Sequence, residues 1–295
     1  MSTVNELVDA LLAPASADVL RALDEEGTLT RFIPELEDGR GFVQPERHYY
    51  DVLDHNLAAV AAADAVLGSG EDAREIREAL AWVDIDELLG RQIEGLPMPA
   101  LVRLGCLVHD VAKPATAVRD EGRLRFPRHG PRGAELMAER LPRLGFGPET
   151  TRFVTNMVRY HLRPRELVKS WPATDRAVRK FVADVDGHVL PLLFVNLADG
   201  MATRGPGYTR EHYRRHCGFI NYVLARAWAV SSDEAPTPLI NGDDLVADLE
   251  LESGTLLGRV LTSVRRSQLA GTISSREEAL GLARTVLANL QAESG

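Results

Sequence analysis

The 295-residue sequence has little cysteine, no long apolar run and little strand-like alternation. Its two cysteines, Cys106 and Cys217, lack CxxC spacing, so the sequence predicts neither a zinc knuckle nor a disulfide framework, and both are expected to be buried thiols. No apolar run approaches the roughly 20 residues that span a bilayer. The N-terminal MSTVNELVDALL has neither a basic region nor a small-residue cleavage site. We therefore expect a cytoplasmic protein with no membrane partner.

The composition is that of a globular protein, but the charge is unevenly distributed. Hydrophobic residues make up 45% and charged residues 26%, enough to bury a core as one large or two small domains. The net charge of -9 argues against a protein that coats nucleic acid without sequence specificity. Residues 123–180 nevertheless hold 14 Lys and Arg against 5 Asp and Glu. This basic stretch suits an anionic substrate, although arginines lying along exposed helix faces would give the same pattern.

Apolar residues recur with helical spacing through most of the chain, which predicts an all-α bundle. A helix over 50–67 places His55 on an apolar face, and one opening at Gly147-Pro148 carries His161. Other helices are predicted over residues 99–112, 132–143, 174–185, 188–203, 209–230 and 275–291, the last begun by a Ser275/Glu278 capping box. The domain prediction is a helical lead-in (1–40), a main domain (41–232) with an acidic insert at about 69–97 packed outside, and a small C-terminal helical subdomain (233–295).

The dipeptide His109-Asp110 in LVRLGCLVHDVAKP is the most informative feature of the sequence. A carboxylate in so apolar a helix is costly to bury unless a cation or hydrogen-bond donor meets it. Asp199 follows the apolar stretch 192–198 and also needs a cation or a hydrogen-bond donor, which a salt bridge to Arg204 could provide. Imidazole and carboxylate groups are ligands for divalent metals. His55, His109, Asp110, His129, His161 and Asp199 are therefore the candidate metal ligands, although a single histidine on an apolar face is more often an ordinary core residue.

The pattern of these residues resembles the signature of a known protein family. His55, His109-Asp110 and Asp199 match the signature of the HD-domain phosphohydrolase superfamily, and His129 with His161 match its binuclear branch. The resemblance is greatest to the HD region of bacterial tRNA nucleotidyltransferases of the CCA-adding and poly(A) polymerase family, and it covers roughly residues 18–290. The segments that carry it are Leu20 through Phe32-Ile-Pro-Glu-Leu36, Gln44, His48, Tyr50–His55, Phe126–Ala134, Leu239–Leu245 and Gly271–Leu280.

The sequence departs from that family at its N-terminus. The family's polymerase chemistry resides in a head with a glycine-rich strand-turn and paired aspartates, and nothing before residue 18 matches it. Asp84-Ile-Asp86 has the carboxylate spacing alone and is interpreted as a solvated helix face. We therefore expect a headless relative without nucleotide-adding activity. The resemblance implies metal-dependent phosphodiesterase and phosphatase activity on 2′,3′-cyclic nucleotides, RNA ends and nucleoside monophosphates.

The resemblance also implies roles for individual residues. His55, His109, Asp110 and Asp199 would hold one metal, and His129 with His161 the other, with Asp110 bridging. The metals, which could be Mn, Ni, Co, Fe, Zn or Mg, would lower the pKa of a bound water and so supply the nucleophile. Asp110 and Lys113 are the predicted catalytic residues. Lys113 is also expected to bind a nonbridging phosphate oxygen, and Arg128, Arg132 and Arg163 are expected to form charge-assisted bonds to the same group.

Two other functions fit the same residues. A triphosphohydrolase or 5′-nucleotidase of this superfamily would use the same metals with a different pocket, and a noncatalytic RNA-binding module would need only a basic surface. The sequence shows no glycine-rich loop to cradle a polyphosphate. We therefore expect a 2′,3′-cyclic phosphodiester to be opened faster than a 3′,5′-cyclic one or a triphosphate.

Overall fold

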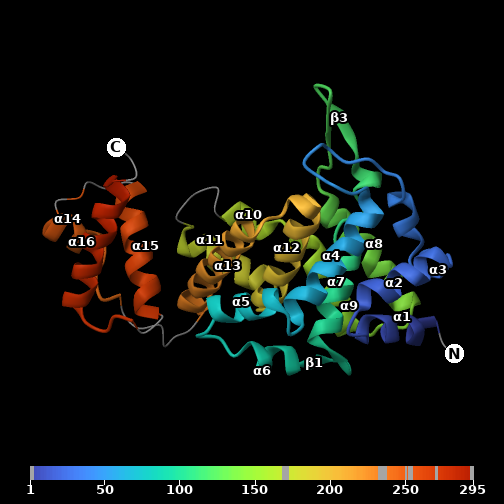
Figure 1. Ribbon diagram of the computed structural model, residues 1–295, viewed down its shortest axis with the longest axis horizontal. Coiled ribbons are helices and arrows are strands. Elements are labelled where there is room, and N and C mark those ends of the chain that lie inside the picture. Colours follow the sequence, from blue (N-terminus) through green and yellow to red (C-terminus); the bar gives the residue numbers. More distant parts are fainter. Residues whose placement is uncertain are drawn as a thin grey trace. The chain divides into compact units, whose positions relative to one another are not determined.

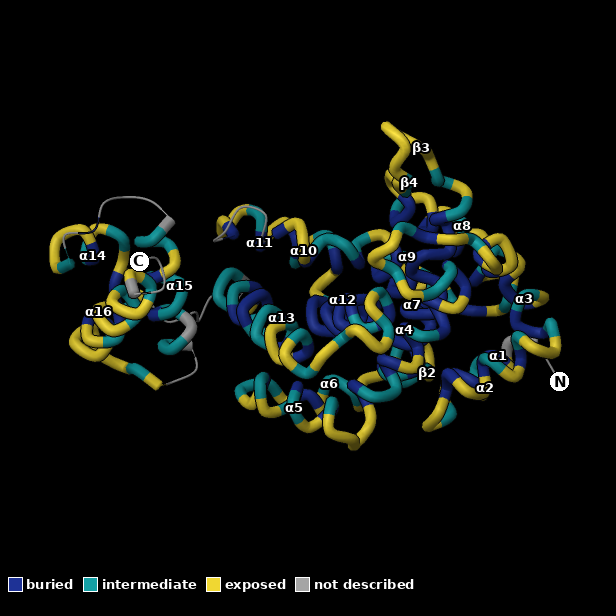
Figure 2. The backbone as a smooth tube through the Cα atoms, turned by 45° about the horizontal axis from the view of Figure 1, so that its top comes forward, coloured by how far each residue is buried: buried dark blue, intermediate teal, exposed yellow. Residues whose placement is uncertain are grey.

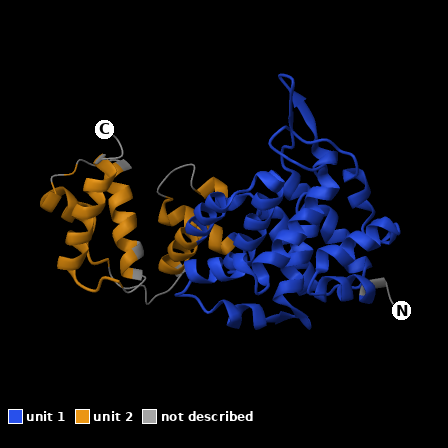
Figure 3. Ribbon diagram, in the orientation of Figure 1, with its two compact units in different colours: residues 1–164, 184–220 blue, residues 165–183, 221–295 orange. Residues whose placement is uncertain are grey.

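The structure is a computed structural model that describes residues 3–167, 173–231, 238–249, 251, 255–269 and 272–292. Its regular structure is mostly helical, which confirms the all-α class (Figure 1). The chain forms two compact units, residues 1–164 with 184–220 and residues 165–183 with 221–295 (Figure 3). The predicted domain boundary between 232 and 233 lies outside the described residues. Within the described residues no single helix is long and apolar enough to cross a membrane, although α11 and α12 taken together reach that length and composition.

Three apolar helices form the centre of the first unit: α4 (Val52–Leu67), α7 (Met98–Val108) and α12 (Val189–Arg204). They pack on one another, and α7 is buried at nearly every position (Figure 2). Helices that are apolar on most sides belong in a core, and most residues of these three helices are buried. The N-terminal elements α1 (Thr3–Leu12), α2 (Ser16–Glu25), α3 (Thr28–Phe32) and η1 (Pro34–Gly39) precede them, with α1 against α7 and α2 against α4.

Two further helices complete the central layer. Helix α8 (His129–Arg143) packs along α9 (Pro148–Tyr160), which also contacts α7. The close approach of α8 to α9 depends on two glycines at the start of α8. A Cβ added to Gly130 would lie 2.9 Å from the Arg159 carbonyl oxygen, and one added to Gly133 would lie 2.9 Å from Val158 Cγ1. These glycines thus bring the start of α8 against the end of α9.

The acidic segment 69–97 forms α5 (Glu71–Ala79), α6 (Ile85–Gly90) and a short hairpin of β1 (Gln92–Ile93) with β2 (Leu96–Pro97). Its acidic side chains lie at the surface while Ala73 and Ile76 are buried. Arg210 forms ion pairs with three carboxylates of α5, which fastens this segment to the unit. Asp84 caps α6 and the Asp86 side chain is 82% exposed, as expected of a surface helix rather than a polymerase site.

A second hairpin joins η2 (Pro114–Thr116) to α8. Strands β3 (Val118–Asp120) and β4 (Arg123–Arg125) pair antiparallel, with Arg119 opposite Leu124 and Asp120 opposite Arg123. The turn residues Glu121 and Gly122 have φ values of 49° and 76°, the left-handed geometry that tight hairpins favour. Sequence reasoning missed both hairpins because two or three residues per strand are too few to show alternation.

The remaining helices are α10 (Arg163–Leu167), α11 (Asp175–Asp184), η3 (Gly205–Gly207), α13 (Arg210–Ser231), α14 (Gly242–Leu249), α15 (Thr255–Leu269) and α16 (Arg276–Ala292). The last three helices share an apolar cluster that includes Leu245, Val260 and Ala279. The capping box predicted before α16 is confirmed, since Ser275 and Glu278 each accept a hydrogen bond from the other's backbone N–H.

Candidate metal centre

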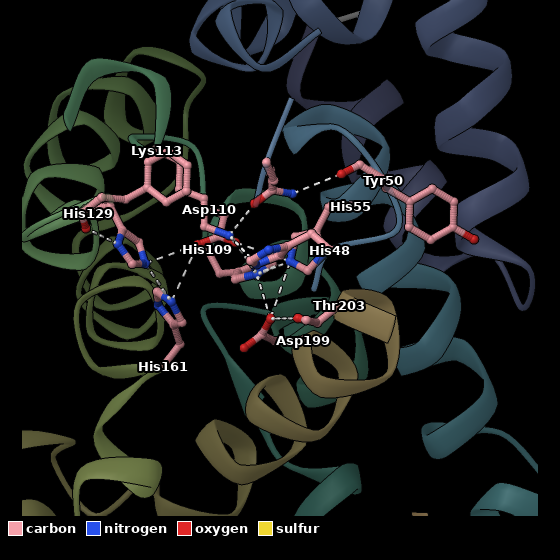
Figure 4. A network of polar contacts seen from close by, with 12 residues as sticks. His48, Tyr50, His55, His109, Asp110, Lys113, His129, His161, Asp199 and Thr203 are labelled. Atoms are coloured by element: carbon pink, nitrogen blue, oxygen red, sulfur yellow. Dashed lines mark hydrogen bonds and ion pairs between the residues drawn. The ribbon is translucent and has the colours of Figure 1, made fainter. Parts of the chain in front are cut away.

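Six ionisable side chains from five helical elements of the first unit meet in the buried interior (Figure 4). They are His55 on α4, His109 and Asp110 just after α7, His129 at the start of α8, His161 just after α9 and Asp199 on α12. Each is no more than 7% exposed. The six predicted ligand residues therefore lie together, although as many as 144 positions separate them in the sequence.

Hydrogen bonds to backbone carbonyls near helix ends orient the rings of three histidines. Helix α7 ends at Val108, earlier than the predicted residue 112, and α9 ends at Tyr160. The last carbonyls of a helix lack intrahelical partners, and His109 Nδ1 donates to Cys106 O (2.7 Å) while His161 Nδ1 donates to Val158 O (2.7 Å). His129 Nδ1 likewise donates to Phe126 O at 2.8 Å. With Nδ1 protonated, each ring turns its Nε2 toward the centre, and that atom is free to bind a metal when the ring is neutral.

The first cluster gathers around one oxygen of Asp110. Asp110 Oδ2 lies 3.2 Å from the Nε2 atoms of both His55 and His109. Asp199 Oδ1 lies 3.3 Å from His55 Nε2 and 3.7 Å from His109 Nε2. Thr203 donates its hydroxyl proton to Asp199 Oδ1 at 3.1 Å, whereas the Arg204 guanidinium contacts His212. Asp199 is thus directed toward the histidines and not toward Arg204.

The second cluster lies at the other oxygen of the same carboxylate. Asp110 Oδ1 is 3.2 Å from His129 Nε2 and 3.6 Å from His161 Nε2. The two Nε2 atoms are 3.2 Å apart. Asp110 therefore faces one cluster with each oxygen, which is the arrangement of a bridging carboxylate.

This donor set fits divalent cations. His129 and His161 both commit their Nδ1 protons to carbonyls, so two bare nitrogens face each other at 3.2 Å without a proton between them in the neutral state. Asp110 Oδ1 is also buried without a hydrogen-bond donor among the described residues. Lone pairs so placed repel and are costly to bury unless a cation meets them. The ligand atoms of each cluster lie within 4.8 Å of one another.

The electrostatics keep the shared carboxylate ionised. Burial alone would raise the pKa of Asp110, but the adjacent Lys113 ammonium and His109 hold it well below its usual range. Burial alone would lower the pKa of His109, but Asp110 and Asp199 raise it to about 10. At His161 burial prevails and lowers the pKa to about 3. Asp110 is therefore a carboxylate, and His161 a neutral ring, at neutral pH.

Lys113 is fixed beside the centre. Its Nζ pairs with Asp110 Oδ2, donates to Gln44 Oε1 at 2.6 Å and lies 5.6 Å from the centroid of the Phe126 ring. Gln44 is oriented in turn by donating to the carbonyls of Tyr50 (3.2 Å) and Asp51 (3.3 Å). Lys113 is thus held beside Asp110 by Gln44, which the sequence had singled out only through the family resemblance.

The three predicted arginines have separate environments. Arg128 is exposed and has a φ of 57°, a left-handed conformation that turns the chain into α8 just before His129. Arg132 pairs with Glu135 at 2.9 Å. Arg163 lies 3.8 Å from Asp184. Their phosphate-binding roles remain predictions.

An outer layer of polar groups supports His161, and sequence reasoning missed it. Asn196 Nδ2 donates to the His161 carbonyl at 3.0 Å, and His216 Nε2 donates to Asn196 Oδ1 at 3.1 Å. The Tyr208 hydroxyl bonds to His216 Nδ1 at 3.0 Å. Asn196 is fully buried within the apolar α12. A polar amide in so apolar a stretch was the sequence feature that could have indicated this outer layer. These contacts fix the backbone that carries a candidate ligand.

Comparison with known proteins agrees with the centre. The HD domain family model matches residues 64–199. The A-adding tRNA nucleotidyltransferase of Deinococcus radiodurans is 29% identical over 281 residues, 93% of this chain and 56% of the relative. The CC-adding tRNA nucleotidyltransferase of Thermus thermophilus is 30% identical over 277 residues, 93% of this chain and 54% of the relative.

A bifunctional uridylyltransferase/uridylyl-removing enzyme of Ruegeria pomeroyi is 26% identical over 181 residues, 60% of this chain and 18% of that protein. The chain thus spans about half the length of the two tRNA nucleotidyltransferases it matches. The matched family and the two buried His/Asp clusters agree in one conclusion: this protein carries an HD domain with a candidate binuclear metal centre and is a homologue of the bacterial tRNA nucleotidyltransferases.

Proposed function

We propose that this protein is a metal-dependent phosphodiesterase and phosphatase that acts on 2′,3′-cyclic nucleotides, RNA ends and nucleoside monophosphates. One observation carries the proposal: Asp110 presents one oxygen to His55 and His109 and the other to His129 and His161. Two divalent cations held this way would activate water and neutralise a phosphoryl group. The names of the relatives, which act on tRNA, support a substrate with RNA-type ends.

The chain's own residues would hold and orient the substrate. Lys113 is 5% exposed, and Asp110 and Gln44 hold its ammonium in place, so it would be preorganised next to a bound phosphate. Asp110 anchors that ammonium, and Gln44 limits its movement. His48 is 3.5 Å from Lys113 Nζ, and burial and the neighbouring cation lower its pKa to about 4. His48 is therefore neutral and adds no competing charge.

The test is a parallel assay of metal-loaded protein on 2′,3′-cAMP, 3′,5′-cAMP, AMP and dGTP. We expect 2′,3′-cAMP to be opened fastest, because its strained ring exposes phosphorus. Tripolyphosphate release from dGTP with inert 2′,3′-cAMP would establish the triphosphohydrolase alternative instead. Elemental analysis of the purified protein identifies the metal and shows whether two ions are bound per chain.

A further inference from the structure

Three exposed side chains lie on segments that flank residues of the metal centre: Arg119 and Arg123 on the β3–β4 hairpin and Tyr49 in the loop before α4. We refer to these residues as the RNA-end surface. We propose that it binds the upstream nucleotides of a single-stranded RNA whose 3′ end enters the centre, so that RNA ends are preferred over free nucleotides. This inference rests on the proposed phosphodiesterase function.

The hairpin is rooted in the centre at both ends. It leaves the core just after Lys113 and returns at Phe126, and these residues contact each other through the ammonium and the ring. The Phe126 carbonyl also orients His129. At about 3.3 Å per residue, Arg123 lies roughly 10 Å along the strand from Phe126. The hairpin therefore projects from the centre (Figure 1), and its strands are largely exposed (Figure 2).

The hairpin arginines suit phosphates. Arg119 and Arg123 are exposed, and within the described part of the chain neither guanidinium pairs with a carboxylate, whereas Arg125 is paired with Asp120 at 3.1 Å. Arg123 begins the basic stretch 123–180 of a protein whose net charge is -9, and Arg119 lies four positions before it. A free nucleotide places its phosphate at the centre itself. Only a longer strand brings further phosphates to these arginines, and such contacts dominate the affinity of nucleic-acid binding.

Tyr49 has the properties of a base-stacking platform. Its backbone N–H donates to the Thr203 carbonyl at 3.0 Å, and its ring lies against Gly205, where an added Cβ would approach ring atoms within 2.8 Å. The Tyr50 ring supports it edge-on, with centroids 4.8 Å apart. The Tyr49 residue is nevertheless 64% exposed. An aromatic ring held on one side and open on the other binds bases of any sequence.

The position of Tyr49 connects it to the centre. It follows His48, which contacts Lys113, and its backbone is tied to Thr203, whose hydroxyl binds Asp199. On this proposal, a nucleotide whose phosphate lies on the two Asp/His clusters would extend its base toward Tyr49. The Arg119 and Arg123 guanidiniums and the flat face of Tyr49 together favour single-stranded RNA over a folded protein partner.

The binding experiment uses metal-free full-length protein and a fluorescent single-stranded RNA of about eight nucleotides, with anisotropy measured over a range of salt. Arg119→Ala/Arg123→Ala should weaken binding at least about tenfold and reduce the slope of log K against log salt by about 1.4, because each phosphate contact contributes about 0.7. Tyr49→Ala should weaken it at least about fivefold, with Tyr49→Phe close to wild type. Arg119→Lys/Arg123→Lys should retain most of the salt dependence.

The matched control is Arg74→Ala/Arg143→Ala, which removes the same charge from α5 and from the far end of α8. It should change neither the affinity nor the salt slope. Equal loss in the hairpin variant and this control would reduce the effect to net charge and overturn the proposal. So would wild-type RNA binding in both the hairpin variant and Tyr49→Ala, once circular dichroism shows that they are folded.

A kinetic experiment connects the surface to catalysis. With metal-loaded protein, kcat/KM is compared between 2′,3′-cAMP and the same RNA carrying a 2′,3′-cyclic phosphate end. The hairpin variant should lose at least about tenfold more activity on the RNA than on 2′,3′-cAMP. Equal losses on both substrates would overturn the proposal. No hydrolysis of either substrate by wild type would refute the phosphodiesterase function, while the anisotropy experiment would still decide whether RNA binds this surface.

Discussion

Replacing Asp110 by alanine should separate two roles of one carboxylate. In the metal-free protein Asp110 is the partner of Lys113, whose residue is only 5% exposed. Removing one member of a buried ion pair leaves an uncompensated charge and costs about 3–5 kcal/mol. Asp110→Ala should therefore be markedly less stable than wild type without metal. Removing an unpaired buried acid would instead be favourable, and it is the contact with Lys113 that reverses the sign.

A second variant removes the charge imbalance. Asp110→Ala/Lys113→Met deletes both members of the pair, and apolar replacement of a buried pair is often close to neutral. Most of the lost stability should therefore return. The metal response should not return, because the shared ligand is still missing. Free metal at 100 times its Kd should stabilise wild type by about 2.7 kcal/mol for each ion bound, or a Tm increase of roughly 5–10 °C per ion for a unit of this size.

The assay is thermal and urea unfolding of the three proteins, each with chelator and with excess Mn²⁺. We expect the single variant to be destabilised in chelator, the double variant to be near wild type in chelator, and only wild type to respond to metal. A wild-type metal shift in Asp110→Ala would refute the bridging role of Asp110. A double variant as unstable as the single one would refute the ion-pair explanation and indicate a cavity or packing effect.

Three further predictions use other parts of the structure. His161→Ala should reduce bound metal from two ions to one by elemental analysis, since it belongs only to the second cluster, and an unchanged count would exclude His161 as a ligand. Gly133→Ala should destabilise the protein by about 1–3 kcal/mol in urea unfolding, because its Cβ would lie 2.9 Å from Val158 Cγ1, and no loss would mean that α8 shifts freely. Burial lowers the pKa of His188 below its ordinary 6.5, so as pH falls through 6.5 the unfolded chain takes up the proton first and stability declines. His188→Phe should show a smaller decline between pH 7.5 and 5.5 in thermal unfolding, and an identical pH profile would contradict this cause.

Local sequence was enough to identify the chemistry of the centre. Helical spacing placed His55 on an apolar face, and Asp110 and Asp199 followed apolar stretches, so each acid required a partner inside the protein. Burial then followed from the mostly apolar composition of α4, α7 and α12. Such patterns depend on neighbours three or four residues apart, which a single sequence displays directly.

Only the tertiary structure decided how these residues meet. The direction of His109 and His161 depends on where α7 and α9 end, and His129 lies beside His161 because Gly130 and Gly133 let α8 approach α9. The pairing of Lys113 with Asp110 and Gln44, and the support of His161 by Asn196, join residues between 3 and 69 positions apart. Helical periodicity fixes which face a side chain occupies but not which distant helix covers that face. The sequence therefore determined the candidate ligands, and packing between distant helices determined the division of Asp110 between two clusters.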